Sequence, residues 1–494
     1  MNRSKDDPPG WSVTRGSDFL QLNPADAPPG GLSDWLARQL RDAIADGRLP
    51  LGARLPPTRT LAADLRISRG AVTDAYQRLV DDGHIAGRGR AGTTVVAAPR
   101  TTPAPSRHRP PDPPFPGEPH PDAFDALRAA AARIDLTPGV PDLSAFPRAA
   151  WQRAERAVLR DLPTAALGYG DPRGTTALRT AAAAWLARNR GIRADPAHIV
   201  IVAGTAQALA LIARVLTRDG IRTIAVEDPG SLGVRQHLNH WGMDTPPVPV
   251  DTSGARIDRL RATTAPAALL TPAHQFPTGA VLTGDRRRDL MRWAAAGGLV
   301  IEDDYDAEHR YDRPPTPALR SLLTDSVFYA GSVSKLLAPA LRTGWLLPPP
   351  AHLDAVVHEK RFADLGNAAL PQLVLARLMD SGEMERILRL LRRRHRRRRD
   401  TMIAAIAAHL PGASVHGTAA GLHLTITFDA PPGARVHDAD LAAAALHHGA
   451  KTQPLSWHAQ LPGPPGLVLG YAAVPPSDIT DGIAAIGRAL HDLT

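Results

Sequence analysis

The stretch Val327-Phe328-Tyr329-Ala330-Gly331-Ser332-Val333-Ser334-Lys335 is a short apolar run that leads into a turn of glycine and hydroxyl residues and ends on a lysine. Comparable apolar runs, each followed by a polar or glycine turn, occur at residues 198–202, 223–226, 267–270 and 299–301. Residues 206–218 and 286–296 have helical periodicity and separate several of these runs. Short buried strands that alternate with helices predict a mostly parallel sheet covered by helices.

The region downstream of this sheet is expected to form a smaller lobe. Two more strand candidates, residues 422–428 and 467–471, lie among helices there. We therefore expect an α/β domain over residues 134–494, with an α+β lobe from about residue 355 to residue 494. The chain has 494 residues, 43% of them apolar, so it is too long for one ordinary domain and apolar enough for a sizeable core.

The N-terminal part predicts a second, smaller domain. Helical periodicity and stop signals indicate three helices, over residues 32–47, 58–65 and 68–82. Ser68 is the expected N-cap of the third helix. Two short strands, residues 84–85 and 93–96, flank the turn Gly87-Arg88-Gly89-Arg90-Ala91-Gly92. Three helices and a small hairpin predict a winged helix-turn-helix domain over residues 31–97.

Two segments are not expected to contribute to either core. Residues 1–30 are polar and rich in proline, and we expect a flexible tail there. Between Pro99 and Pro121 there are ten prolines in 23 residues, which predicts a semi-rigid polyproline spacer that can reach on the order of 70 Å. A proline-rich linker is therefore expected over residues 98–133.

The composition narrows the class of protein. A formal net charge of +9 indicates an anionic partner, and the absence of cysteine excludes disulfides and thiolate metal sites. We expect no metal site. Residues 1–10 lack the apolar stretch of a secretory signal, and no apolar run approaches the roughly 20 residues of a membrane-spanning helix. These features predict a cytoplasmic protein.

The third predicted helix has the features of a DNA-recognition helix. Its start, Ser68-Arg69-Gly70-Ala71-Val72-Thr73, offers a hydroxyl and free backbone amides to a phosphate, with Gly70 among them. Arg69 and Thr73 are four residues apart and so lie on one face of the helix, where they can reach base edges. Arg59, at the start of the preceding helix, is expected to clamp the DNA backbone.

The glycine turn is expected to supply the remaining DNA contacts. Arg88 and Arg90 could reach into the adjacent minor groove. The alternative is a small helical domain that binds another protein, with its arginines forming a solvated face.

The lysines point to the chemistry of the larger domain. Lysine occurs only at positions 5, 335, 360 and 451. Lys335 follows the strand, with the hydroxyls of Ser332 and Ser334 beside it and Arg342 seven residues on. The segment Gly204-Thr205-Ala206 joins a predicted strand to a helix and forms an anion site.

Asp303 and Tyr305 end another strand and face the same side. Together with the lysine turn and the anion site, they make up the set that pyridoxal 5′-phosphate requires: an amine for the internal aldimine, a carboxylate against the pyridine nitrogen, a donor to the ring oxygen and a phosphate cup. Each element alone is weak evidence, and their order along the chain is the stronger signal.

Longer motifs resemble known families. The run Asp46-Gly47-Arg48-Leu49-Pro50-Leu51-Gly52-Ala53-Arg54-Leu55-Pro56-Pro57-Thr58-Arg59, followed by Ile67-Ser68-Arg69, resembles the GntR family of bacterial regulators. The resemblance implies DNA contacts from Arg59, Arg69, the recognition helix and the wing glycine Gly92. The wing differs from the usual Arg-Pro-Gly-Ser-Gly-Thr and carries an extra arginine.

The larger domain resembles the effector domain of the MocR subfamily within that family. The motifs are Tyr169-Gly170-Asp171-Pro172-Arg173-Gly174, Glu227-Asp228-Pro229-Gly230, Thr271-Pro272-Ala273-His274-Gln275-Phe276-Pro277-Thr278-Gly279, Ile301-Glu302-Asp303-Asp304-Tyr305-Asp306 and the run from Gly331 to Arg342. The resemblance implies a fold-type-I aminotransferase fold that binds pyridoxal 5′-phosphate, and a head-to-tail homodimer.

The roles that this resemblance implies fall on the residues already identified. Lys335 would form the Schiff base, Asp303 would bind the pyridine nitrogen and Tyr305 the ring hydroxyl. The phosphate would be held by Arg342, by Ser332 and Ser334 and by the cup Gly204, Thr205 and Ala206.

Three positions depart from the subfamily pattern. Ser231 stands where members often have a tyrosine that stacks on the cofactor. Ala203-Gly204 replaces the common Ser-Gly of the phosphate cup. Val468, in Leu467-Val468-Leu469-Gly470-Tyr471, stands where the arginine that binds the effector carboxylate is found.

Two further features have alternative interpretations. The arginine-rich run 392–399 is interpreted as one face of a charged helix with Ile387, Leu391 and Met402 on its buried edge, rather than as a nucleic-acid site. His274 is either a donor to the cofactor or a hydrogen-bonded loop histidine.

The preferred hypothesis is a DNA-binding transcription regulator that senses pyridoxal phosphate, or an amine or amino-acid effector, through aldimine formation at Lys335. One alternative is an active aminotransferase fused to a DNA-binding module. A second alternative is a regulator whose aminotransferase-like domain is a cofactor-free dimerisation domain. Residual half-transamination is the most enzyme activity that the departures lead us to expect.

Overall fold

The computed structural model describes residues 20–87, 92–96, 115, 122–311, 316–428 and 437–493. The chain divides into two compact units, Met1–Pro110 and Pro111–Thr494. Each unit has its own hydrophobic core.

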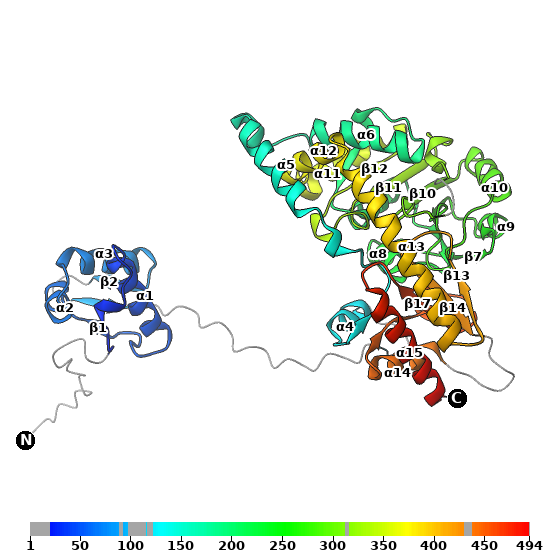
Figure 1. Ribbon diagram of the computed structural model, residues 1–494. Coiled ribbons are helices and arrows are strands. Elements are labelled where there is room, and N and C mark those ends of the chain that lie inside the picture. Colours follow the sequence, from blue (N-terminus) through cyan, green and yellow to red (C-terminus); the bar gives the residue numbers. More distant parts are fainter. Residues whose placement is uncertain are drawn as a thin grey trace, which may run out of the picture. The chain divides into compact units, whose positions relative to one another are not determined.

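The first unit contains three helices and a three-stranded sheet (Figure 1). The helices are α1 (Leu32–Ala45), α2 (Thr58–Leu65) and α3 (Arg69–Asp81), and the strands, in sheet order, are β1 (Arg54–Leu55), β3 (Thr93–Val95) and β2 (Ile85–Gly87). All neighbouring strands are antiparallel. The predicted winged helix-turn-helix is therefore confirmed, and β1 is a strand that the periodicity did not indicate.

The core of this unit extends into the predicted N-terminal tail. Leu20 is buried with Leu36 and Leu40 of α1 and Val72 of α3. A short 3-10 turn, Pro24–Asp26, is capped by the side chain of Asn23, which accepts a hydrogen bond from the Ala25 amide at 3.2 Å. The described part of the segment predicted as a flexible tail thus packs on the winged-helix domain, because Leu20 adds apolar surface to its core.

The second unit is built on an eight-stranded sheet (Figure 1). In sheet order the strands are β5 (Val200–Val202), β12 (Gly344–Leu347), β11 (Val327–Ser332), β10 (Leu299–Asp304), β9 (Ala267–Leu270), β6 (Ile224–Asp228), β7 (Pro247–Asp251) and β8 (Gly254–Ala255). The strands from β11 to β7 pair in parallel, whereas β12 and β8 pair antiparallel to their neighbours. The expected mostly parallel sheet is confirmed.

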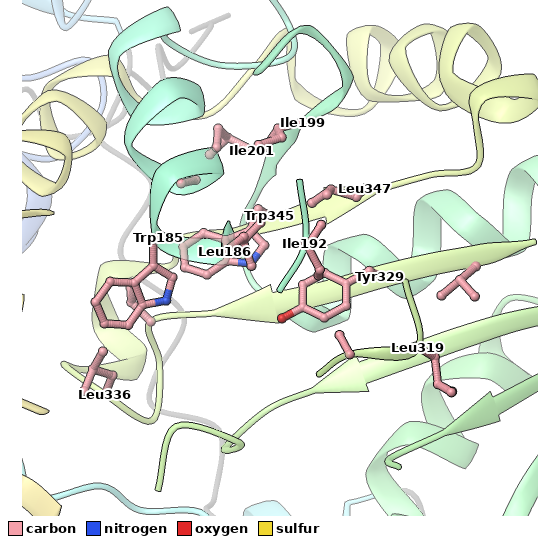
Figure 2. Close-up of a cluster of buried hydrophobic side chains, with 14 of the residues drawn as sticks. Trp185, Leu186, Ile192, Ile199, Ile201, Leu319, Tyr329, Leu336, Trp345 and Leu347 are labelled. Atoms are coloured by element: carbon pink, nitrogen blue, oxygen red, sulfur yellow. The ribbon is translucent and has the colours of Figure 1, made fainter. Parts of the chain in front are cut away.

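The strands of this sheet carry apolar side chains on both faces, and helices therefore cover both faces. One face is covered by α5 (Arg148–Asp161), α6 (Thr176–Arg190), α9 (Ile257–Ala262), α10 (Gly284–Ala295), α12 (Ala369–Asp380) and the start of α13 (Glu383–His409). The other face is covered by α7 (Thr205–Arg218), α8 (Leu232–His240) and α11 (Leu353–Asp364). Figure 2 shows part of the first of these cores, to which Trp185 of α6, Trp345 of β12 and Tyr329 of β11 all contribute.

A second core defines the smaller lobe. Its sheet has the order β13 (Ala413–His416), β14 (His423–Phe428), β17 (Gly466–Gly470) and β16 (Gln453–Pro454), and it is packed by α14 (Asp438–His447), α15 (Pro476–Leu493) and the end of α13. The pair β4 (Ile134–Asp135) and β15 (Ala450–Lys451) is parallel and contributes to the same core. The predicted boundary near residue 355 is wrong, because α11 and α12 pack in the cores of the large sheet. The lobe's core takes Ile134, Leu136 and Tyr311 from earlier in the chain and then continues from Met402.

Helix α13 confirms the structural interpretation of the arginine-rich run. Ile387, Leu391 and Met402 form its buried edge. Several arginines of the run bond within the domain: Arg394 and Arg398 contact the buried carboxylate of Asp142 at 3.2 and 2.9 Å.

Helix α4 (Ala123–Ala129) lies inside the range that was predicted as a linker. Leu127 is buried against Leu232 and Trp457, and the rings of Phe115 and Phe124 lie 5.6 and 5.9 Å from the Trp457 ring. The prediction of a linker that extends to residue 133 is therefore wrong at its C-terminal end. The many prolines upstream obscured a short apolar face that packs on the second unit.

None of the described helices combines the length and the hydropathy needed to cross a membrane.

Gly174, which precedes α6, provides a test of the packing. Its φ is +99°, and a Cβ there would lie 2.5 Å from Ile201 Cγ1 and 2.7 Å from Gln372 Oε1. We expect Gly174→Ala to cost about 2–5 kcal/mol of unfolding free energy, since it adds a clash in the core to a strained backbone. Gly297, at φ +103° with nothing within 4 Å of such a Cβ, is the matched control and should cost about 1–2 kcal/mol. Urea unfolding followed by tryptophan fluorescence measures both, and equal losses would contradict this account.

Candidate functional site

Helix α3 of the first unit presents a polar start to solvent. Ser68 is its N-cap, and the side-chain oxygen accepts a hydrogen bond from the Ala71 amide at 3.2 Å. Ser68, Arg69, Gly70 and Thr73 are exposed, whereas Val72, Tyr76 and Leu79 are buried. The predicted DNA-facing residues therefore share the solvent side of the helix, and its free N-terminal amides suit a phosphate.

Arg59 and Arg69, the two arginines predicted to contact DNA from these helices, have no side-chain partner among the described residues. Within the described part of the chain, neither Arg59 nor Arg69 makes a side-chain hydrogen bond or an ion pair, although Arg41 and Arg78 of the same unit pair with Asp82 and Asp34. The hydroxyl of Thr73 donates to the Arg69 carbonyl at 2.9 Å, which leaves its lone pairs to accept from a base or water.

The wing is described only in part. Gly92 is exposed with φ +85°, a conformation that favours glycine and turns the chain into β3. Arg88 and Arg90, which were expected to reach the minor groove, lie outside the described residues. The described residues thus present an exposed, polar helix start with an unpaired arginine, Arg59, at the start of the preceding helix.

The DNA for this test is a duplex from the promoter region of the gene that encodes the protein. We expect Arg69→Ala to weaken binding to it by about tenfold or more, because a contact to a base edge is worth about 1–3 kcal/mol. Arg59→Ala should weaken binding to all DNA sequences alike. It should also reduce the slope of the logarithm of the binding constant against the logarithm of the salt concentration by about one. Fluorescence anisotropy over a salt series measures both. Arg48→Ala is the control, since that guanidinium already pairs with Asp46 at 2.7 Å, and an equal loss in all three variants would contradict the assignment.

The second unit contains a cavity of about 830 Å³ at the carboxyl ends of the parallel strands. Lys335 faces it from the turn after β11, and Asp303 and Tyr305 face it from the end of β10. The Nζ atom of Lys335 donates to the Gly139 carbonyl. Burial lowers the pKa of Lys335, while the charges of Asp306 and Asp303 oppose that shift. The structure thus brings together the lysine, carboxylate and phenol that the sequence predicted.

Asp303 has unused hydrogen-bonding capacity. Its buried Oδ1 atom has no hydrogen-bond partner among the described residues. Burial raises the pKa of Asp303 to about 7, helped by the charge of Asp304 and opposed by Lys335. A buried carboxylate without a donor is costly, and the N–H of a protonated pyridine would supply one. The carboxylate therefore fits the ring nitrogen of pyridoxal phosphate.

The hydroxyl of Tyr305 lies in a hydrogen-bonded cluster. It is 3.1 Å from His274 Nδ1, which is also 3.0 Å from Asp306 Oδ2; His274 and Asp306 are buried, and Tyr305 is half-buried at the cavity. Burial raises the pKa of Tyr305 well above its usual value. His274 is thus bonded to Tyr305 and Asp306, so it holds the phenol that would bind the ring hydroxyl.

The same cluster includes the one grouping among the described residues whose spacing suits a metal ion. Atoms of His274, Asp306 and His423 lie within 4.8 Å of one another. His423 Nε2 is 3.1 Å from the Pro277 carbonyl oxygen, and burial lowers the pKa of His423 to about 3. Hydrogen bonds to Tyr305 and Asp306 already occupy His274 Nδ1, so the cluster is linked to the phenol of Tyr305.

The predicted phosphate cup forms where α7 begins. Thr205 and Ala206 line the cavity, and Gly204 has φ +83°. A Cβ on Gly204 would lie 3.3 Å from Arg342 Nη1, so the guanidinium rests directly behind the glycine. Arg342 also donates to the Ala203 carbonyl. Ser332 lies close by, because a Cβ on Gly344 would lie 3.1 Å from Ser332 Cβ and 3.3 Å from Gly204 Cα. The Ser332 hydroxyl accepts from the Ser334 amide at 3.4 Å.

A residue that the sequence analysis did not assign supports this cup. Lys360 of α11 donates to Gln207 Oε1 at 2.9 Å, and the same oxygen accepts from the Ala203 amide at 2.8 Å. Lys360 is fully buried and also pairs with Asp364 at 2.6 Å. The scarcity of lysine in the chain was a signal that could have found it.

Two of the positions that depart from the subfamily pattern, Ser231 and Val468, make other contacts in the structure. The side chain of Ser231 caps α8 by accepting from the Val234 amide at 3.3 Å, and Ser231 lines the cavity without an aromatic ring. Val468 is fully buried in β17 and packs in the lobe's sheet opposite Thr425 and Gln453. Neither position can supply the group that it replaces.

In the cofactor-free protein we expect Asp303→Asn to raise the unfolding temperature in a pH-dependent way. The folded pKa of Asp303, about 7, lies above its value of about 4 in an unfolded chain. Ionising Asp303 therefore costs more in the folded protein than in the unfolded chain. The resulting loss of unfolding free energy grows from about pH 4 to about pH 7 and is complete above pH 7. Asparagine does not ionise, so the gain should be larger at pH 8 than at pH 5.

Thermal unfolding at the two pH values measures this gain. The exposed Asp380→Asn is the matched control and should show no such dependence. A gain in Asp303→Asn that is largest at pH 5 would contradict the assignment.

Comparisons with known proteins agree with this geometry. Residues 133–452 match the family model of class I and II aminotransferases, and residues 32–95 match that of bacterial regulatory proteins of the gntR family. A pyridoxine biosynthesis transcriptional regulator, PdxR of Corynebacterium glutamicum, is 31% identical over 418 residues, which cover 83% of this chain and 86% of that one. The probable rhizopine catabolism regulatory protein MocR of Rhizobium meliloti is 30% identical over 472 residues, which cover 92% of each chain.

A solved structure shares the fold of the second unit. The α-aminoadipate aminotransferase LysN of Thermus thermophilus, complexed with N-(5′-phosphopyridoxyl)-L-leucine, superposes with a TM-score of 0.67 at 26% identity, over 75% of this chain and 94% of that one. Class I and II aminotransferases use pyridoxal 5′-phosphate, the cofactor that the described residues fit.

Proposed function

The chain belongs to the MocR subfamily of GntR-type transcription regulators, and on that premise we propose that it senses pyridoxal phosphate, or an amine or amino acid that reacts with it, at Lys335. The observation that carries this proposal is the juxtaposition of Lys335 and Asp303 on one cavity, with Asp303 Oδ1 lacking a hydrogen-bond partner among the described residues. An amine and a spare buried acceptor are the groups that the two ends of a pyridoxal ring need.

When bound, the cofactor supplies an aldehyde carbon that can be held either by a lysine or by the amine of a ligand. The protein's residues have separate tasks around it. Lys335 supplies an amine whose lowered pKa favours the neutral, nucleophilic form. Asp303 holds the proton at the ring nitrogen, and Tyr305, fixed by His274, donates to the ring oxygen. The start of α7, with Arg342 behind it, binds the phosphate.

This ligand state would be passed to the DNA-binding domain through the domain arrangement. In the proposed assembly two chains form a head-to-tail homodimer, as is typical of the subfamily, and present two α3 helices to paired half-sites. A ligand that favours one arrangement over another would change the affinity for such a pair. The cytoplasm, where both the DNA and the cofactor are available, is the proposed location.

Two departures favour sensing over sustained transamination. The position expected to carry a carboxylate-binding arginine is Val468, an apolar side chain buried in β17. Ser231 lacks the ring that would stack on the cofactor. Turnover needs firm orientation of two successive substrates, and both changes remove orienting contacts.

The test is to load the protein with pyridoxal phosphate, reduce it with borohydride and locate the phosphopyridoxyl group by peptide mass spectrometry. We expect the adduct on Lys335, and we expect Lys335→Ala to abolish both the adduct and the response of DNA binding to added amines. Lys5→Ala is the matched control and should behave as the wild type, since that lysine lies outside the cofactor-binding unit.

The alternatives give different results in the same preparation. Accumulation of a keto acid over many turnovers from an amino-acid panel would favour an aminotransferase. Absence of any cofactor absorbance in the wild-type protein would favour a dimerisation domain and would overturn the proposal.

A further inference from the structure

Helix α4 and strand β15 form a part of the cavity wall to which the proposed function assigns no contact with the cofactor. Phe124, Leu127 and Arg128 line the cavity from α4, and Lys451 lines it from β15. The loss of an arginine at Val468 leaves a carboxylate-bearing ligand without its expected partner. The cations that line the cavity besides Lys335 are therefore the candidates to replace it.

Three such cations line the cavity, and one is already committed. Both terminal nitrogens of Arg235 donate to backbone carbonyls, those of His458 and Trp457, each at 3.1 Å. Arg128 is exposed and pairs with Asp125 one turn earlier in α4. Lys451 is largely buried, and its Nζ atom lies 2.9 Å from Asp135 Oδ2 and 3.3 Å from the Ala130 carbonyl oxygen.

The contacts of Lys451 leave room for a ligand. An ammonium group has three N–H donors, and these two contacts use two of them. Asp135 is partly satisfied by other donors, because its Oδ1 accepts from the amide and the hydroxyl of Thr137 at 2.9 and 2.6 Å. The third donor of Lys451 is available to an anion in the cavity that Lys451 lines.

A continuous segment links Lys451 to Lys335. Asp135 pairs with Lys451 across β4 and β15, and Gly139, four residues on, accepts from Lys335 Nζ. Asp135, Thr137, Pro138 and Gly139 all line the cavity. Four residues span at most about 14 Å, so an amine at Lys335 and an acid group at Lys451 fit the two ends of one small molecule.

We infer that Lys451, assisted by Arg128, binds the carboxylate of an amine effector and thereby couples the effector to α4. The inference rests on the proposed function, because it assigns the second end of the ligand that Lys335 would hold. Lys451 donates to Ala130, the C-cap of α4, so a carboxylate bound by the third donor of the same ammonium group is linked through that group to the end of α4. Helix α4 is the first described helix after the proline-rich segment.

The experiment compares ligands with and without the acid group. The cofactor-loaded protein is titrated with ω-amino acids of increasing chain length and with n-alkylamines of matched length, and the cofactor absorbance reports binding. We expect the wild type to prefer the amino acid at one chain length by about tenfold to 100-fold, as a charge-assisted hydrogen bond implies. Lys451→Met should remove this preference without weakening the alkylamines, and Lys451→Arg should restore part of it.

Two further variants test the role of Arg128 and provide a control. Arg128→Met, at an exposed position that should not affect folding, should lower the preference by about twofold to fivefold. Arg133→Met is the control, because its guanidinium pairs with Asp481 at the surface and does not line the cavity. A preference that survives in Lys451→Met, or equal weakening of both ligand types, would overturn the inference.

Coupling to α4 has its own measurement. Amide hydrogen exchange in α4 should change when the wild type binds the preferred amino acid and should not change with the matched alkylamine. Unchanged exchange would overturn the coupling. A wild type that binds alkylamines and amino acids equally would overturn this inference while leaving the proposed function intact, and a wild type without cofactor absorbance would overturn both.

Discussion

The parallel pairing of β10 with β11 is the constraint on which the rest of the effector domain depends. In this register Asp303 lies opposite Ala330 and Asp304 opposite Gly331. Parallel strands end at the same edge of a sheet, so the acidic end of β10 and the turn that carries Lys335 meet there. A slip of one residue would turn Asp303 away from the cavity, because successive side chains point to opposite faces.

The three buried carboxylates at the end of β10, Glu302, Asp303 and Asp304, need hydrogen-bond donors or cations. Asp304 accepts from Arg190 Nε at 2.5 Å and from the hydroxyl of Tyr329, while Glu302 accepts the amides of Leu319 and Arg320 at 2.9 Å each. These contacts tie the end of β10 to α6 and to neighbouring turns. Asp303, between them, faces the cavity and keeps an oxygen without a partner among the described residues. The surrounding ion pairs therefore hold in place a carboxylate that is left for a ligand.

The cavity is lined by two different parts of the chain. Lys335, Asp303 and the cup come from the sheet, whereas α4 comes from the segment that follows the prolines. The anchor of α4 is apolar, through Leu127, Leu232 and Trp457, and its end is held by the polar contact from Lys451.

Much of this could be predicted from the sequence, since local patterns carry local information. The periodicity of α1, α2 and α3, the cap at Ser68 and the apolar runs of the parallel strands follow from neighbouring residues alone. The order of Gly204, Asp303 and Lys335 indicated the cofactor site, because connections in such a sheet bring successive strand ends to one edge.

Other features depend on contacts between residues far apart in the chain. The packing of α4 was hidden because its apolar face is short and lies beside a proline-rich stretch, and its partner Trp457 is more than 300 residues away. The roles of Lys360 under the phosphate cup and of Lys451 in the cavity wall also arise from distant partners, Gln207 and Asp135. The sequence by itself determined which chemistry the chain carries, and only the tertiary structure decided which buried charges are satisfied and which remain free to bind, because that depends on side chains that meet only when the chain is folded.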